Sequence, residues 1–141
     1  MRGDRAQPDG LLASLRRLLG LPTEPALRGQ RGVGQRGERV AEQHLRGLGY
    51  DLLARNWRGA GGELDLIARD GETTVFVEVK SGAADAKLPP QVHVSRAKQR
   101  QLVRLAEAYC KQEGLLGRPA RIDVVEVLWE REGKVAAVRH H

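Results

Sequence analysis

Apolar and polar residues form their clearest pattern between Gly62 and Lys80, where two segments flank an Asp-Gly pair. The segments Glu63 to Arg69 and Thr73 to Lys80 are rich in β-branched and apolar residues. Asp70-Gly71 is a dipeptide that readily adopts the positive φ angles of a type I′ turn. The pattern therefore predicts a β-hairpin in this stretch.

A turn centred on Asp70-Gly71 sets the predicted pairing of the hairpin. In this register Glu63 lies opposite Glu78, and Asp65 is the diagonal neighbour of Glu78 at roughly 7 Å. Strand side chains alternate between the two faces of a sheet. One predicted face carries Glu63, Asp65, Ile67, Thr74, Phe76, Glu78 and Lys80. The other is purely apolar and carries Leu64, Leu66, Val75, Val77 and Val79.

Charged side chains on a hairpin whose second face is purely apolar indicate a site within a core hairpin. Three carboxylates and a lysine placed so closely destabilise a sheet unless a cation neutralises the carboxylates. For Glu78 and Lys80 taken alone, the alternative is an exposed face with a simple Glu-Lys pair. Asp65 on the paired segment favours a metal site instead, because one cation can bridge two carboxylates at this spacing.

Helical and strand patterns flank the hairpin on both sides. Glu38 borders the apolar stripe of the first predicted helix and can point at the hairpin, although the helix dipole alone also favours a glutamate there. Asp123 shares a side with Val125 and Val127 and is expected to be a supporting hydrogen-bond partner. The predicted elements are a helix at Gln35–Leu48, a strand at Tyr50–Trp57, a helix from Ser95 to Gly114, a strand at Ile122–Trp129 and an edge strand at Lys134–Val138.

This order of elements predicts an α/β fold in a single domain at residues 35–141. The second helix is the crossover that makes the following strand parallel to its neighbour in the sheet. Residues 1–34 are rich in Gly, Pro, Arg and Gln and are predicted to form a mobile N-terminal extension. Within them, Leu11 to Leu19 predicts a short amphipathic helix, expected to pack on its own domain or on nothing rather than on a partner or a membrane.

Composition and charge narrow the class of partner. Lys and Arg number 24 against 18 Asp and Glu, which gives a net charge of +6. This balance favours a polyanionic partner, and nucleic acid is the first candidate. The single cysteine, Cys110, excludes a disulfide framework and fits a reducing compartment, so the cytoplasm is the expected location. No apolar run reaches the roughly 18 residues that span a bilayer.

The second predicted helix is basic on its polar faces. Its candidate nucleic-acid-binding residues are Arg96, Lys98, Arg100 and Arg104, because phosphate contacts supply most of the affinity for DNA. A solvated face with charge pairs at i and i+4 is an alternative of equal weight. The four histidines show no metal-ligand spacing beyond the terminal pair, and no role is predicted for them.

Six segments of the chain, in this order, carry a family resemblance. They are GERVAEQHLRGLGY at 37–50, RNWR at 55–58, GGELDLI at 61–67, VFVEVK at 75–80, KQRQL at 98–102 and RIDVVEV at 121–127. Together they resemble the bacterial YraN-like family, over the stretch from Gly34 to Val138. That family is grouped with the PD-(D/E)XK nuclease superfamily and is similar to the archaeal Holliday-junction resolvases.

The resemblance implies a restriction-endonuclease-like core, in which helices flank a central mixed β-sheet in the order α-β-β-β-α-β-β. By position, it makes Asp65 and Glu78 the metal ligands and Lys80 the catalytic lysine. It also makes Glu38 the helix-borne acidic residue of the site, and Gln99 a polar residue beside it.

The chemistry of these residues suits a magnesium site. Asp65 and Glu78, with the backbone carbonyl of Val79 and bound waters, offer the oxygen ligands that Mg²⁺ prefers, and Mn²⁺ is the expected substitute. Glu63 is an additional acidic residue on the same predicted face. Lys80 is expected to orient the attacking water and to offset charge on phosphorus.

The expected function is metal-dependent hydrolysis of phosphodiester bonds in DNA, with junction or branched DNA as the implied substrate and a homodimer by analogy with resolvases. The chain departs from the family pattern at Ser81–Ala84, after the catalytic lysine. One alternative is a non-catalytic nucleic-acid-binding module that keeps the nuclease fold. Another is a structural protein whose basic surface binds an acidic protein. The intact set of carboxylates and lysine favours the enzyme.

Overall fold

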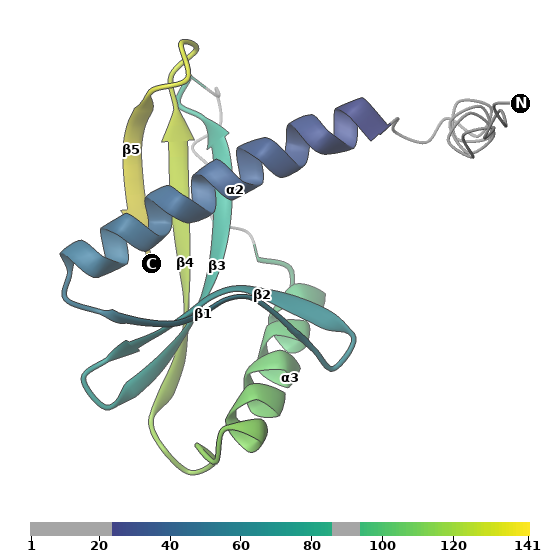
Figure 1. Ribbon diagram of the computed structural model, residues 1–141, viewed down its shortest axis with the longest axis vertical. Coiled ribbons are helices and arrows are strands. Elements are labelled where there is room, and N and C mark those ends of the chain that lie inside the picture. Colours follow the sequence, from purple (N-terminus) through teal and green to yellow (C-terminus); the bar gives the residue numbers. More distant parts are fainter. Residues whose placement is uncertain (1–23, 86–93) are drawn as a thin grey trace, which may run out of the picture. The chain divides into compact units, whose positions relative to one another are not determined.

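The computed structural model describes residues 24–85 and 94–141, with side chains from residue 34 onward (Figure 1). The chain divides between Val33 and Gly34, and Gly34–His141 is the compact unit that holds every predicted site residue. The predicted helix at Leu11–Leu19 lies outside the described residues. The elements are α2 (Glu24–Gly47), β1 (Asp51–Gly59), β2 (Gly62–Asp70), β3 (Thr73–Ala83), α3 (Arg96–Gln112), β4 (Ala120–Trp129) and β5 (Val135–His140).

The five strands form one mixed sheet in the order β1-β2-β3-β4-β5. All neighbours are antiparallel except β3 and β4, which run parallel because α3 forms the crossover between them (Figure 1). The predicted α/β architecture and element order are therefore confirmed. Ser95 caps α3, since its hydroxyl oxygen accepts a hydrogen bond from the backbone N–H of Lys98 at 3.2 Å.

One difference concerns the start of α2. The helix begins at Glu24, whereas the apolar stripe predicted a start at Gln35. Pro25 suits the first turn of a helix, because the N–H that proline lacks has no intrahelical partner there. In the part of the chain that the structure describes, no helix is long and apolar enough to cross a membrane.

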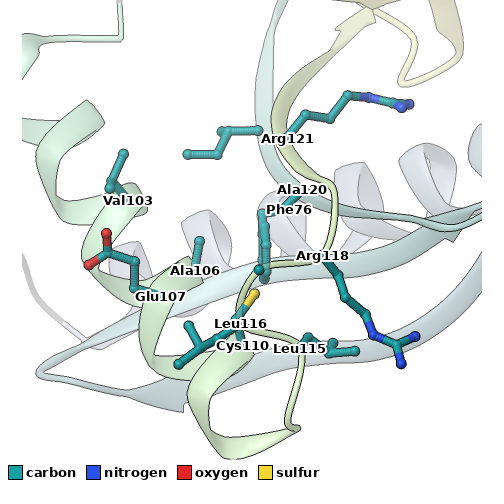
Figure 2. Close-up of a pocket in the computed structure, with 12 residues that line it drawn as sticks. Phe76, Val103, Ala106, Glu107, Cys110, Leu115, Leu116, Arg118, Ala120 and Arg121 are labelled. Carbon is teal, nitrogen blue, oxygen red and sulfur yellow. The ribbon is translucent and has the colours of Figure 1, made fainter.

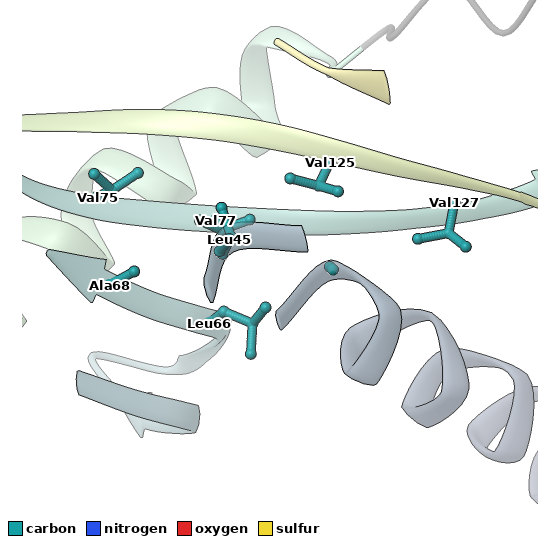
Figure 3. Packing of buried hydrophobic residues seen from close by; sticks show 8 residues of the cluster. Leu45, Leu66, Ala68, Val75, Val77, Val125 and Val127 are labelled. Carbon is teal, nitrogen blue, oxygen red and sulfur yellow. The ribbon is translucent and has the colours of Figure 1, made fainter. Parts of the chain in front are cut away.

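The two helices cover opposite faces of the sheet. On one face, Ala41 and Leu45 of α2 pack on a buried layer of aliphatic side chains (Figure 3). That layer consists of Leu66, Ala68, Val75, Val77, Val125 and Val127. Asp123, buried at the same side of β4, accepts hydrogen bonds from Arg121 and contacts His140 at 2.8 Å, which confirms its predicted supporting role.

The opposite face is covered by α3 and is richer in aromatic residues. Tyr109 of α3 lies edge-on to Trp57 and Phe76, with ring centroids 5.6 and 5.7 Å apart. The remaining buried members are Leu64, Ile67, Leu102, Leu105 and Cys110. Gly62 permits close packing here, because a Cβ at this position would lie 2.8 Å from the side chain of Gln101 on α3.

The hairpin forms, but its predicted register is wrong. Asp70 pairs with Thr73, so the two loop residues are Gly71 and Glu72. Gly71 has a φ of +59° at the first loop position, the pattern of a type II′ turn. Asp70 stays in the ladder, and its carboxylate accepts a hydrogen bond from Arg121 at 3.0 Å.

The register changes which carboxylates face each other. Leu66 pairs with Val77 and Ile67 with Phe76. The last pair of the ladder is Leu66–Val77, and the next residues along the two strands are Asp65 and Glu78, whereas the predicted register set Glu63 opposite Glu78. The two carboxylates proposed as metal ligands therefore lie directly beyond the point where β2 and β3 stop pairing.

The predicted face of Leu64 is also wrong, because β1 and β2 both change faces at one point. Leu64 packs in the α3 cluster, whereas Leu66 packs in the α2 cluster. A regular strand would place both residues on one face. Between the pairs Arg55–Leu66 and Trp57–Leu64 lies Asn56, which has a φ of +47°. This left-handed residue, on the strand beside Asp65, accompanies the reversal.

Two substitutions at Asn56 separate the effect of its backbone conformation from the effect of losing its side chain. Asn56→Ala and Asn56→Gly both remove the side-chain amide, but only glycine adopts the positive φ without steric cost. Asn56→Ala should therefore be less stable than Asn56→Gly by about 1 kcal/mol or more, measured by chemical denaturation.

The control is the same pair of substitutions at Arg58, a β1 residue whose φ is not positive. There the order should reverse, because glycine weakens an ordinary strand position. If Asn56→Ala is as stable as Asn56→Gly, the left-handed conformation does not constrain the strand.

Candidate active site

The candidate site begins where β2 separates from β3. The regular ladder ends at the pair Leu66–Val77. Beyond it, the backbone N–H of Val79 donates to Oδ2 of Asp65 at 2.8 Å, so a side-chain carboxylate replaces a backbone acceptor. The amide and carbonyl of one strand residue point toward the same neighbouring strand. The carbonyl of Val79 therefore points into the same gap as the Asp65 carboxylate.

Burial dominates the electrostatics of Asp65. The pKa of Asp65 is raised from 3.8 to about 7, chiefly by burial and in addition by the charges of Glu78 and Glu38. The Val79 amide and the Lys98 ammonium act in the opposite direction. A carboxyl that is half protonated near neutral pH lacks sufficient positive charge around it, which is the electrostatic condition of a cation site.

Glu78 faces this gap from β3 and already has one cationic neighbour. Its carboxylate is 13% exposed, and its Oε1 lies 3.4 Å from Nζ of Lys98 on α3. Lys98 was predicted as a nucleic-acid-binding residue of the basic helix. In the structure its ammonium group lies against the Glu78 carboxylate, and its side chain is partly exposed.

Glu38 reaches the same cluster from α2. Burial raises the pKa of Glu38, a hydrogen bond with the Asn56 side chain opposes this rise, and the charges of Glu63 and Glu78 add to it. The helix approaches β3 closely here, since a Cβ on the buried Gly37 would collide with the Ser81 hydroxyl. The sheet and α2 thus bring Glu38 within electrostatic range of Asp65 and Glu78.

Glu63 and Lys80 lie at the edges of this arrangement. The Glu63 carboxylate accepts a hydrogen bond from Arg58 at 3.1 Å, across the β1–β2 pair, and is partly exposed. Lys80 is half-buried on β3, two residues beyond Glu78 on the same face. Its neighbour in the parallel strand β4 is the buried Glu126.

The other predicted residues of α3 lie on its exposed side. Gln99 donates from Nε2 to the backbone carbonyl of Val94 at 2.9 Å, so its side chain lies against the start of its own helix rather than among the carboxylates. Arg96, Arg100 and Arg104 are exposed and line an open groove of about 700 Å³. Basic side chains along one groove are the arrangement that a phosphate backbone requires.

Sequence reasoning missed Asn56 and the contact of Lys98 with Glu78. Asn56 was placed within an ordinary strand, although asparagine is one of the few non-glycine residues that tolerate a left-handed conformation. Lys98 lies in the first turn of α3, where the helix dipole disfavours a positive charge. A lysine at this position indicates a nearby carboxylate partner.

A separate hollow beneath α3 has a different chemistry (Figure 2). Its volume is about 260 Å³, and Phe76, Ala106, Cys110 and Ile122 are among its lining residues. Burial raises the pKa of the Cys110 thiol, which keeps it protonated. None of the predicted site residues is among the described residues that line this hollow.

The donor set at the strand gap is small. Among the described residues, no group of three or more His, Cys, Asp or Glu side chains is arranged to hold a metal ion. A cation would therefore depend on Asp65, Glu78, the Val79 carbonyl and water. These are oxygen donors of the kind that Mg²⁺ prefers, and Mg²⁺ commonly keeps several waters beside one or two carboxylates.

The chain is similar to many bacterial proteins of one family. Residues 37–127 match the pattern of the uncharacterised protein family UPF0102. A UPF0102 protein of Geotalea uraniireducens is 43% identical over 110 residues, which cover 78% of this chain and 86% of that protein. A second, from Clavibacter michiganensis, is 46% identical over 105 residues, covering 74% of this chain and 89% of that protein.

One solved structure, that of Pyrococcus furiosus SfsA in complex with Ca²⁺, is similar at a TM-score of 0.40. It is 18% identical, and the match covers 78% of this chain and 62% of SfsA. The family assignment rests on the sequence matches, which agree with the YraN-like motifs along the chain. The chain belongs to the UPF0102 family.

Proposed function

We propose that the protein is a metal-dependent nuclease that hydrolyses phosphodiester bonds in DNA. One observation carries the proposal: Asp65, Glu78 and Glu38 lie within electrostatic range of each other where β2 separates from β3, and burial, together with the charges of Glu78 and Glu38, raises the pKa of Asp65 to about 7. Such crowding is costly in a folded protein unless a cation relieves it. A scaffold without a cation to bind has no need of this arrangement.

In the proposed enzyme, Asp65, Glu78 and the Val79 carbonyl hold a Mg²⁺ or Mn²⁺ ion. When bound, the ion supplies Lewis-acid polarisation of the phosphate and lowers the pKa of a water molecule. Asp65 serves as a ligand only after it loses its proton. The hydrogen bond from the Val79 N–H keeps the Asp65 carboxylate oriented toward the gap.

Lys80 performs the second part of the proposed chemistry. Its ammonium group orients the attacking water and offsets the negative charge that develops on phosphorus. The water oxygen bonds to phosphorus and gives up a proton to solvent while the P–O3′ bond breaks. The 3′ oxygen takes up a proton from solvent, which leaves a 5′-phosphate and a 3′-hydroxyl. Lys80 would therefore stabilise the transition state more than the ground state.

The exposed arginines of α3 are the proposed DNA contacts. Arg96, Arg100 and Arg104 recur on the exposed side of one helix and line one groove. Lys98 links this helix to the carboxylates through Glu78.

The second candidate is a nucleic-acid-binding module without turnover. The observation in its favour is the ion pair between Lys98 and Glu78, which neutralises part of the carboxylate cluster without a metal. Three measurements test the proposed cation site and DNA surface, and the comparison of binding with cleavage in Lys80→Met separates the enzyme from this alternative.

The first measures cation binding against pH. Because one proton must leave Asp65 before the ion binds, affinity for Mn²⁺ should fall by about tenfold per pH unit below 7 and level off above it. Asp65→Asn should abolish binding in calorimetry. Asp51→Asn, on an exposed β1 carboxylate paired with Arg69, should not change it. Equal affinity in Asp65→Asn and wild type would place the ion elsewhere.

The same pKa fixes the sign of the stability change without metal. The folded-state pKa lies above the ordinary value of 3.8, so the favourable contribution of protonated Asp65 is complete below about pH 4 and is lost as the pH rises through about 7. Mg²⁺ should raise the melting temperature most above pH 7. If the melting temperature of Asp65→Asn depends on pH in the same way as that of the wild-type protein, Asp65 is not the group that titrates near pH 7.

The second measurement separates binding from turnover. Lys80→Met should lower the cleavage rate by about two orders of magnitude or more, while cation binding and most of the DNA affinity in Ca²⁺ remain. Lys111→Met in the last turn of α3 is the control and should cleave normally. A fully active Lys80→Met enzyme would exclude the catalytic role, whereas a loss of stability alone would make Lys80 a counter-ion.

The third measurement tests the groove of α3. Replacing Arg96, Arg100 and Arg104 together by alanine should flatten the plot of log affinity against log salt by up to about one unit per lost phosphate contact. A variant with the same net charge, in which Arg69, Arg118 and Arg131 become alanine, should keep the wild-type slope. If both variants change the slope equally, DNA does not select the α3 groove.

A further inference from the structure

The position of Lys98 is electrostatically costly for a helix. It lies in the first turn of α3, where its backbone N–H bonds to the Ser95 hydroxyl. The first turn contains no acidic residue, and the amino end of a helix carries partial positive charge. The ion pair with Glu78, at 3.4 Å, offsets this cost.

Lys98 also acts as a cation of the carboxylate cluster. Its charge favours the ionised form of Asp65 as well as pairing with Glu78. Its side chain remains 35% exposed, whereas that of Glu78 is 13% exposed. The ammonium group therefore has access to solvent and can leave Glu78 without crossing the protein interior.

A divalent cation at the proposed site competes directly with Lys98. The cation and the Lys98 ammonium group would both bind to the Glu78 carboxylate, and two positive charges at this spacing repel each other. The ion therefore weakens the hold of Glu78 on Lys98. The long, flexible side chain of lysine can then extend into the solvent to which it is already partly exposed.

We propose that Lys98 is a substrate-binding residue that exchanges Glu78 for a phosphate group of DNA when a divalent cation occupies the site. This inference rests on the proposed nuclease function and adds a property to it. Lys98 contributes to DNA affinity only when the cation is present. By thermodynamic linkage, cation and DNA then strengthen each other's binding by the same factor.

The test compares DNA affinity with and without the cation. Fluorescence anisotropy of a labelled DNA duplex would be measured with the full chain, in EDTA and in Ca²⁺ at matched ionic strength. Lys98→Met should lose about fivefold or more of the affinity in Ca²⁺ and none in EDTA. Lys111→Met on the same helix removes the same charge and should change the affinity equally, and little, under both conditions.

Two outcomes would overturn the exchange. An equal loss of affinity in EDTA and in Ca²⁺ would make Lys98 an ordinary surface contact to phosphate. Unchanged affinity under both conditions would make it a structural counter-ion of Glu78. Calorimetry with Ca²⁺ is the control, and Lys98→Met should still bind the cation. If the Met variant fails to fold, Lys98→Arg, which keeps the charge, should retain the dependence on Ca²⁺.

Failure of the exchange is distinguishable from failure of the proposed function. A wild-type protein that binds Ca²⁺ and DNA, but in which Lys98→Met loses affinity equally under both conditions, refutes the exchange and leaves the nuclease proposal intact. A wild-type protein that binds no divalent cation refutes both.

Discussion

The hydrogen bond from the Val79 N–H to the Asp65 carboxylate is the contact on which the candidate site depends. It forms at the point where β2 and β3 stop pairing, because the Asp65 carboxylate takes the place of a backbone acceptor for the Val79 N–H. The reversal of β1 and β2 beside Asn56 sets Asp65 apart from the regular alternation of its strand. Glu78 and Glu38 then converge on this point from β3 and α2.

The cluster is held together by a balance between burial and charge. Burial and neighbouring carboxylates destabilise the ionised form of Asp65, and Lys98 from α3 compensates in part. The two helices that cover the sheet thus contribute opposite charges to one place, an acid from α2 and a base from α3. Because Lys98 neutralises the carboxylates only in part, the site favours a small, highly charged cation, since each added positive charge stabilises several carboxylates at once.

Much of the fold follows from local sequence pattern. Apolar spacing predicted both helices that flank the sheet, the hairpin, and the crossover that makes β4 parallel to β3. The same pattern put Asp65 and Glu78 together, because each strand has an apolar face that must be buried. The pattern could not give the register, since both Asp70-Gly71 and Gly71-Glu72 suit a two-residue turn, and pairing of Asp70 with Arg121 is a tertiary contact. It could not predict the face of Leu64, because that face depends on a local reversal of the backbone. It could not predict the partner of Lys98, because that partner depends on where α3 packs on the sheet.

The central claim is that these carboxylates serve phosphodiester hydrolysis. The most direct measurement incubates the wild-type chain with branched, single-stranded and duplex DNA in Mg²⁺ or Mn²⁺, with an EDTA reaction and Asp65→Asn as controls. The account predicts that at least one of these DNAs is cut in Mg²⁺ or Mn²⁺, and that neither EDTA nor Asp65→Asn permits cutting. Binding of every DNA with cleavage of none, or cleavage that persists in EDTA, would contradict it.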